Sequence, residues 1–193
     1  MTGSAERTTA ETDVRVWVSL EPGRIQVDTG VGFFDHLLSS LAHHGRLSLE
    51  VSGRGDLETG GHHLVEDVGL VLGQALSRAL GSRGSLERFG HAVVPMDDAL
   101  VMAAVDLEGR PYLSLALDLP YRQWGPWETD LWPEFLRALA HSSRTTIHLR
   151  ALAGSDPHHL MEASAKALGV AVGAAAARSE RGSTKGSLGG DSE

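Results

Sequence analysis

A five-residue segment occurs twice in this chain almost unchanged, and this repeat constrains the fold more than any other feature. His-His-Leu-Val-Glu at 62–66 returns as His-His-Leu-Met-Glu at 158–162. Upstream of each copy, the segments 35–43 and 133–141 both end in Leu-Ala-His, which aligns them without gaps. Internal repetition of this kind indicates two similar half-domains packed together.

Each His-His-x-x-Glu segment offers two imidazoles and a carboxylate on one turn of a predicted helix. His62 and Glu66 stand at i and i+4, so they share a helix face and can bind one ion. His63 points about 100° away and faces a different ion. Mixed imidazole and carboxylate ligands suit Mn, Fe, Co, Ni or Zn. The two segments together therefore predict a site for two metal ions.

The upstream alignment adds one residue to each copy, because it places His36 opposite Glu134, and both side chains can bind metal. A solvated helix residue is the alternative for Glu134. The predicted ligands are His36, His62, His63, Glu66, Glu134, His158, His159 and Glu162. The remaining histidines lack this support. His43, His44, His91 and His141 are interpreted as ordinary surface or strand residues, and His148 is left open.

Composition excludes several classes of protein. A net charge of −8 argues against a nucleic-acid binder, since no basic stripe can neutralise phosphates. The absence of cysteine excludes a disulfide framework, thiolate zinc sites and a thiol nucleophile, and it fits a reducing cytoplasm. We expect neither a signal peptide nor a membrane span, because the first residues are polar and no apolar run approaches about 18 residues.

Hydrophobic periodicity predicts the same alternation of strands and helices in each half. Strands are predicted at 14–20, 24–27, 47–51, 89–94, 100–107, 112–119 and 145–152, and helices at 34–44, 62–80, 134–141 and 157–178. Asp156 is the predicted N-cap of the last helix, with Pro157 in its first position. The predicted class is α+β, two pseudo-repeated half-domains that each contain a mixed β-sheet and two helices. Their predicted limits are 7–84 and 85–178, between a disordered N-terminus (1–6) and a flexible Gly/Ser-rich tail (179–193).

Further motifs lie outside the repeat. They include Thr-Gly-Val-Gly-Phe-Phe-Asp-His at 29–36, Pro-Met-Asp-Asp-Ala-Leu at 95–100, Asp-Leu-Glu-Gly-Arg-Pro-Tyr-Leu at 106–113 and Ser-Thr-Lys-Gly at 183–186. Together with the repeat, and in this order, they resemble the imidazoleglycerol-phosphate dehydratase family, manganese enzymes of histidine biosynthesis. The resemblance runs from about Arg7 to Leu188.

The resemblance implies an αββα sandwich like domain 2 of ribosomal protein S5, assembled in a homo-oligomer of about 24 subunits. It implies that the predicted ligands other than Glu134 bind two manganese ions per subunit. Glu11 would transfer a proton, and Arg88, Arg110, Ser183 and Lys185 would hold the substrate phosphate. The implied reaction dehydrates D-erythro-imidazole-glycerol phosphate to imidazole-acetol phosphate, through an imidazolate bound to both manganese ions. The implied setting is cytoplasmic, with no nucleic-acid or membrane partner.

Several positions depart from the family pattern. Glu134 stands where the family usually has His, and the other departures include Ser40, Gly61, Leu64 and Asp98. Two alternatives therefore remain open. One is a paralogue on the same dimetal scaffold with another azole substrate or little activity. The other is a non-catalytic, metal-dependent assembly protein.

Overall fold

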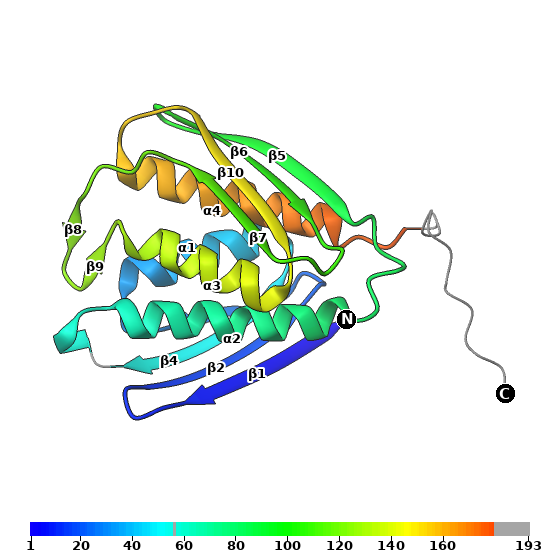
Figure 1. The fold of residues 1–193 in the computed structure, drawn as a ribbon, viewed down its shortest axis with the longest axis horizontal. Coiled ribbons are helices and arrows are strands. Elements are labelled where there is room, and N and C mark those ends of the chain that lie inside the picture. The colour runs from blue at the N-terminus through cyan, green and yellow to red at the C-terminus, as the bar shows by residue number, and fades with distance from the viewer. Residues whose placement is uncertain (56, 180–193) are drawn as a thin grey trace, which may run out of the picture.

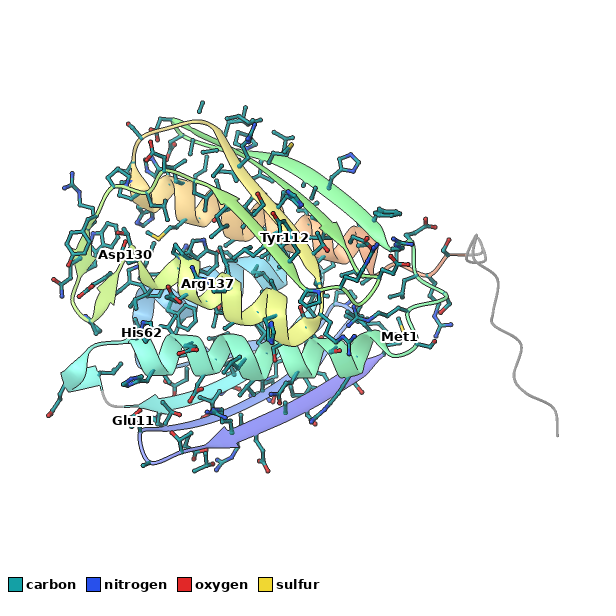
Figure 2. All side chains as sticks on the ribbon, in the orientation of Figure 1. Met1, Glu11, His62, Tyr112, Asp130 and Arg137 are labelled. Carbon is teal, nitrogen blue, oxygen red and sulfur yellow. The ribbon has the colours of Figure 1, made fainter. Side chains whose placement is uncertain are left out.

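The first half of the chain forms a four-stranded sheet and two helices in a computed structural model, which describes residues 1–55 and 57–179 (Figure 1). Its elements are β1 (Thr2–Thr8), β2 (Thr12–Ser19), β3 (Ile25–Asp28), α1 (Gly32–His44), β4 (Ser48–Gly55), the 3₁₀ turn η1 (Leu57–Thr59) and α2 (His62–Leu80). The strands lie in the order β1-β2-β4-β3, with β3 parallel to β4 and the other pairs antiparallel. Val14, Val16 and Val18 are buried and alternate with the exposed Arg15 and Trp17, so one face of this sheet carries core residues.

The second half repeats this order. Its elements are β5 (Phe89–Met96), β6 (Ala99–Asp106), β7 (Tyr112–Ala116), β8 (Gln123–Trp124), β9 (Trp127–Glu128), α3 (Leu131–Ser143), β10 (Thr146–Ala153) and α4 (Pro157–Ala175). The order β5-β6-β10-β7 matches the first sheet, and β7 is again parallel to β10. The hairpin β8–β9 is an addition to this half. The predicted α+β class with two pseudo-repeated half-domains is confirmed.

The two sheets lie outside and the helices lie between them (Figure 1). α2 packs on β1 and β2, and α4 packs on β5 and β6. The order of layers is therefore sheet–helix–helix–sheet, the reverse of the αββα order that the resemblance implied. The physical reason lies in α1 and α4, which carry buried residues on several sides. A helix that is apolar nearly all round must be covered on both sides, so these helices lie between the sheets.

The closest helix pairs join the two halves: α2 packs against α3, and α1 against α4. Glycines allow this approach. A Cβ at Gly69 of α2 would lie 2.8 Å from Cβ of Ala138 in α3, and a Cβ at Gly169 of α4 would lie 2.2 Å from the carbonyl oxygen of Leu41 in α1. Each cross-half pair thus sets a first helix of one half beside a second helix of the other.

The repeat also includes the first strand of each half, because a glycine in each of these strands packs on the same place of the second helix. A Cβ at Gly3 would lie 2.1 Å from the carbonyl oxygen of Ala75, and one at Gly90 would lie 1.9 Å from that of Ala171. Ala75 and Ala171 occupy the same place relative to their His-His pairs. Gly3 and Gly90 are therefore equivalent, and the strands that contain them lie equally close to α2 and α4.

The start of the chain differs from the prediction. Residues 1–6 are not disordered, because Thr2–Thr8 forms β1 and pairs with β2 along its whole length. Only Ala5 of this strand is buried, so the segment has no hydrophobic alternation that could signal a strand. Backbone pairing and the close approach to α2 hold it instead. No helix in the described residues is long and apolar enough to cross a membrane.

Candidate metal and substrate site

His36, His158 and Glu162 meet where α1 packs against the start of α4, and we call them the α1–α4 cluster. Glu162 Oε2 lies 3.1 Å from His36 Nε2 and 3.3 Å from His158 Nε2. One turn further along α4, Lys166 Nζ lies 2.9 Å from Glu162 Oε1. The Glu162 side chain is only 9% exposed, whereas both imidazoles are about half exposed. The cluster is therefore a buried carboxylate surrounded by three nitrogen groups.

Local capping and aromatic contacts position this cluster. The Asp156 side chain accepts hydrogen bonds from the backbone N–H groups of His158 and His159, which confirms the predicted N-cap. The Phe33 ring lies 4.8 Å from the His158 ring and 5.4 Å from that of Trp124 in β8. The added hairpin thus places an aromatic wall beside one imidazole of the cluster.

His62, Glu66 and Glu134 form the corresponding α2–α3 cluster, which is more open. His62 Nε2 lies 3.7 Å from Glu66 Oε2, and both side chains are about half exposed. Glu66 and Glu134 line one hollow between the helices, together with Arg137 and His141. The Glu134 carboxylate forms an ion pair with Arg137. This cluster therefore has two carboxylates where the α1–α4 cluster has one.

The second imidazole of each pair contacts a carboxylate from the first turn of its own half. His63 Nδ1 lies 3.3 Å from Glu11 Oε2. His159 Nδ1 lies 2.7 Å from Asp98 Oδ1, and its Nε2 lies 3.3 Å from Asp97 Oδ2. The register set by the two strand glycines also makes Glu11 and Asp98 equivalent. The sequence analysis named Asp98 only as a departure from the family pattern and predicted no contact between it and His159.

Hydrogen bonds keep the carboxylates of Glu162 and Asp98 ionised. Burial raises the pKa of Glu162, but hydrogen bonds from Lys166 and His36 outweigh it and leave that pKa below its ordinary value. The backbone N–H of Ser155, the His159 ring and a second backbone N–H lower the pKa of Asp98 to about 2. Asp98 in turn raises the pKa of His159. Both carboxylates are thus hydrogen-bond acceptors at neutral pH.

Arg88 and Arg110 come together around two carboxylates. Arg88 donates to Asp106 from Nε at 2.8 Å and from Nη2 at 3.0 Å, and Nη2 also donates to Glu108 at 2.6 Å. Arg110 forms an ion pair with the same Glu108 and is 71% exposed. The structure therefore groups the two predicted phosphate-binding arginines.

These arginines do not reach the clusters within one chain. Arg88 directly precedes β5, whereas Asp97, which contacts His159, directly follows it. A strand of this length spans roughly 25 Å at about 3.3 Å per residue. The predicted phosphate site and the predicted metal site thus lie at opposite ends of the second half. Ser183 and Lys185 lie outside the described residues.

The donor atoms suit a transition metal, although the clusters are not closed around one. Within residues 1–55 and 57–179, no group of three or more His, Asp or Glu side chains is arranged to hold an ion. Imidazole nitrogens and ionised carboxylates are nevertheless the donors that Mn²⁺ and its neighbours take. The paired rings stand nearly perpendicular, at 80° for His62 and His63 and 85° for His158 and His159. Each pair therefore faces two directions.

The other histidines and the substituted positions have structural places. His148 lies beside Tyr112 on the second sheet, with ring centroids 5.6 Å apart. His141, interpreted as an ordinary residue, lines the hollow of the α2–α3 cluster. Leu64 and Ser40 are buried, and Gly61 is an N-cap without a side-chain hydrogen bond. Two of the departures from the family pattern thus lie in the core.

Fold and clusters together define a protein made of two copies of one α+β unit, each with the same imidazole and carboxylate set at the start of its second helix. Residues 29–172 match the family model of imidazoleglycerol-phosphate dehydratase. The chain belongs to the imidazoleglycerol-phosphate dehydratase family.

Relatives and solved structures agree with this assignment. The imidazoleglycerol-phosphate dehydratase of Moorella thermoacetica is 51% identical, over 86% of this chain and 86% of its own length. That of Halorhodospira halophila is 47% identical, over 97% and 98%. The Pyrococcus furiosus structure, a complex with (S)-C348, has a TM-score of 0.82 at 38% identity and covers 94% of this chain and 98% of its own. The predicted hydro-lyase class and the place in histidine biosynthesis are confirmed.

Proposed function

We propose that this chain dehydrates imidazoleglycerol phosphate to imidazole-acetol phosphate, with the α1–α4 and α2–α3 clusters as its metal site. The duplication carries the proposal. Each half supplies two imidazoles and a carboxylate from its second helix, and the facing first helix of the other half adds one more donor: His36 for the α1–α4 cluster and Glu134 for the α2–α3 cluster. We place the reaction in the cytoplasm, which the absence of cysteine fits.

We propose two Mn²⁺ ions per chain, held by the eight predicted ligands. The donor set supports this, because every member offers an imidazole nitrogen or a carboxylate oxygen. The nearly perpendicular rings in each His-His pair support the sharing of one pair between two ions. Bound divalent ions would supply Lewis-acid stabilisation of negative charge on the substrate ring.

Glu11 is the proposed proton-transfer residue. Its side chain is 57% exposed and lies beside His63, on the turn between β1 and β2. The Thr9 hydroxyl accepts a hydrogen bond from the Glu11 backbone N–H at 3.1 Å, which supports the turn. A carboxylate that is held at its backbone but accessible at its tip can accept a proton from a substrate carbon.

Arg88 and Arg110, with Ser183 and Lys185, are the proposed phosphate-binding residues. Guanidinium groups bind phosphate bidentately, and Asp106 already orients Arg88 through two parallel hydrogen bonds. The distance between this group and the clusters supports a composite site, in which the arginines of one copy serve the clusters of another. We therefore propose a homo-oligomer, of about 24 subunits as the resemblance implies.

Metal analysis and a substrate assay test the proposal directly. Full-length protein purified with Mn²⁺ should contain about two ions per chain by elemental analysis. It should convert imidazoleglycerol phosphate, and it should restore growth without histidine to a strain that lacks the dehydratase. Protein that contains no divalent ion and has no turnover would end the proposal.

Subunit mixing tests the composite site. Arg88→Ala and His158→Ala should each be inactive alone, because each removes one part of every site. Dissociation with a chelator, mixing and reassembly with Mn²⁺ should restore partial turnover, since some sites then combine two intact parts. A mixture that reassembles but stays inactive would contradict sharing between subunits.

A further inference from the structure

We infer that Asp98 is a positioning residue, which holds the His159 ring with its proton on Nδ1 and thereby presents Nε2 to a metal ion. The inference rests on the proposed role of His159 as a ligand. It gives a role to a carboxylate that lies behind the ring, on the side away from the proposed ligand atom.

Both oxygens of Asp98 have fixed partners. Oδ1 lies 2.7 Å from His159 Nδ1. Oδ2 accepts hydrogen bonds from the backbone N–H groups of Ser155 at 2.8 Å and Asp156 at 3.3 Å. An ionised carboxylate can only accept, so the Nδ1 that faces it must donate. On its other side the ring faces a looser partner, because Nε2 lies 3.3 Å from Asp97 Oδ2 and the Asp97 side chain is 71% exposed. A metal ion at Nε2 takes the place of a proton shared with Asp97, and the neutral imidazole that donates from Nδ1 then offers its electron pair there.

The backbone on both sides of this contact is constrained. Asp97, in the turn between β5 and β6, has φ of 48°, which is left-handed. Across from it, Gly154 has φ of 113°, and a Cβ there would lie 2.7 Å from Cα of Ala99. Asp98 thus joins a tight hairpin turn to the start of α4. The imidazole is held from a rigid point, which is what a preorganised ligand needs.

The equivalent carboxylate in the first half is held differently. Glu11 Oε2 lies 3.3 Å from His63 Nδ1, and its carboxylate accepts no backbone hydrogen bond in the described part of the chain. Its side chain is also longer and 57% exposed. Two equivalent positions have therefore diverged. Glu11 keeps the freedom that proton transfer needs, whereas Asp98 is immobilised against one imidazole.

Asp98→Asn should reverse the His159 tautomer. The Asn oxygen is best placed to accept from the two backbone N–H groups, so its NH₂ group faces His159 and can only donate. The ring must then accept at Nδ1 and carry its proton on Nε2, the proposed ligand atom. Loss of a residue that orients a ligand typically weakens metal binding by about 10–100-fold.

The experiment titrates chelated, full-length protein with Mn²⁺ and follows the free ion by electron paramagnetic resonance. In Asp98→Asn, one of the two ions should bind about 10–100-fold more weakly and the other as in the parent. Asp98→Glu keeps a carboxylate and should bind both within about threefold. Asp118→Asn removes the same charge at an exposed position outside these contacts, and it should bind both normally.

The outcomes separate this inference from the proposed function. A parent protein that binds no Mn²⁺ contradicts the metal site itself. A parent that binds two ions, with Asp98→Asn binding both equally tightly, overturns the role of Asp98 alone. Should Asp98→Asn not fold, a neutron diffraction map of the parent protein at pH 9 decides. A deuteron on His159 Nδ1 supports the inference, and a deuteron on Nε2 alone refutes it.

Discussion

The α1–α4 and α2–α3 clusters occupy equivalent places in the duplicated fold, yet their side chains are arranged differently. Those of the α1–α4 cluster contact one another, whereas those of the α2–α3 cluster lie further apart. Glu162 is buried and lies within 3.3 Å of two imidazoles and a lysine. Glu66 is half exposed, and its nearest imidazole is 3.7 Å away. The duplicated backbone alone therefore does not determine how tightly a cluster closes.

Three substitutions between the halves explain this difference. Lys166, which neutralises Glu162, corresponds to Leu70 in the first half. Asp156 caps α4, whereas the residue at its place in the first half is Gly60, and Gly61, the N-cap of α2, likewise offers no side chain. The third is Glu134 in place of an imidazole. Two carboxylates that face one hollow repel each other unless a cation lies between them. The α2–α3 cluster thus needs a bound cation to bring its carboxylates together, more than the α1–α4 cluster does.

The largest expected effect comes from Glu11. Glu11→Gln keeps the size and hydrogen-bonding capacity of the side chain but cannot accept a proton. We expect kcat to fall by about 10²–10⁴-fold while both ions stay bound, since within the described residues the Gln amide oxygen is not taken up by backbone N–H groups and can still accept from His63 Nδ1. Steady-state kinetics and elemental analysis of the same sample measure both quantities. Unchanged kcat would assign proton transfer to another group.

Glu162 and Glu66 should differ in what they contribute to stability. Glu162→Ala leaves Lys166 in a largely buried place without its carboxylate, at a cost of about 3 kcal/mol. Glu66→Ala removes a half-exposed group, and the cost should stay below about 0.5 kcal/mol. Urea denaturation in the presence of chelator measures both. Equal losses would show that the two clusters are equally closed in solution.

The clusters could be predicted from the sequence because their chemistry lies in a short repeat. His-His-x-x-Glu at helical spacing determines which side chains share a face, and the Leu-Ala-His alignment identified Glu134 as the counterpart of His36. The positions of α2 and β6 also matched their hydrophobic periodicity. Such local patterns are readable because they depend on residues a few positions apart.

What the sequence did not reveal depends on contacts between distant segments. The layer order follows from which helix faces the other half, and β1 depends on pairing rather than on its own side chains. The separation of Arg88 from the clusters follows from the length and direction of β5. The contact between Asp98 and His159 was not predicted, because the two residues lie on different elements. Periodicity carries no information on these long-range placements.

Glu134 tests whether the difference between the clusters is functional. Glu134→His makes the α2–α3 cluster resemble its counterpart, and it removes an anion that should lower the Lewis acidity of the ion. We expect turnover to stay equal or to rise by up to about tenfold. Glu134→Ala should instead lose one ion, because the adjacent Arg137 charge is then unopposed.

Metal content and kinetics of both Glu134 variants decide this question. Full occupancy and unchanged turnover in Glu134→Ala would mean that Glu134 is a solvated helix residue paired with Arg137. A decrease of turnover in Glu134→His with both ions bound would mean that this chain has adapted to the carboxylate.

The smallest expected effect concerns the cap of α4. Asp156→Ala removes the acceptor for the backbone N–H groups of His158 and His159, so it should cost about 1 kcal/mol of stability. Asp130 offers a matched control, because it is the N-cap of α3 but makes no side-chain cap hydrogen bond. Asp130→Ala should therefore change the urea midpoint by less than half as much. The two variants remove the same charge at the same helical position, so their difference isolates the hydrogen bonds. If both midpoints shift equally, the cap contributes only through charge, and the closer arrangement of the α1–α4 cluster must come from Lys166 and from His36 at the place of Glu134.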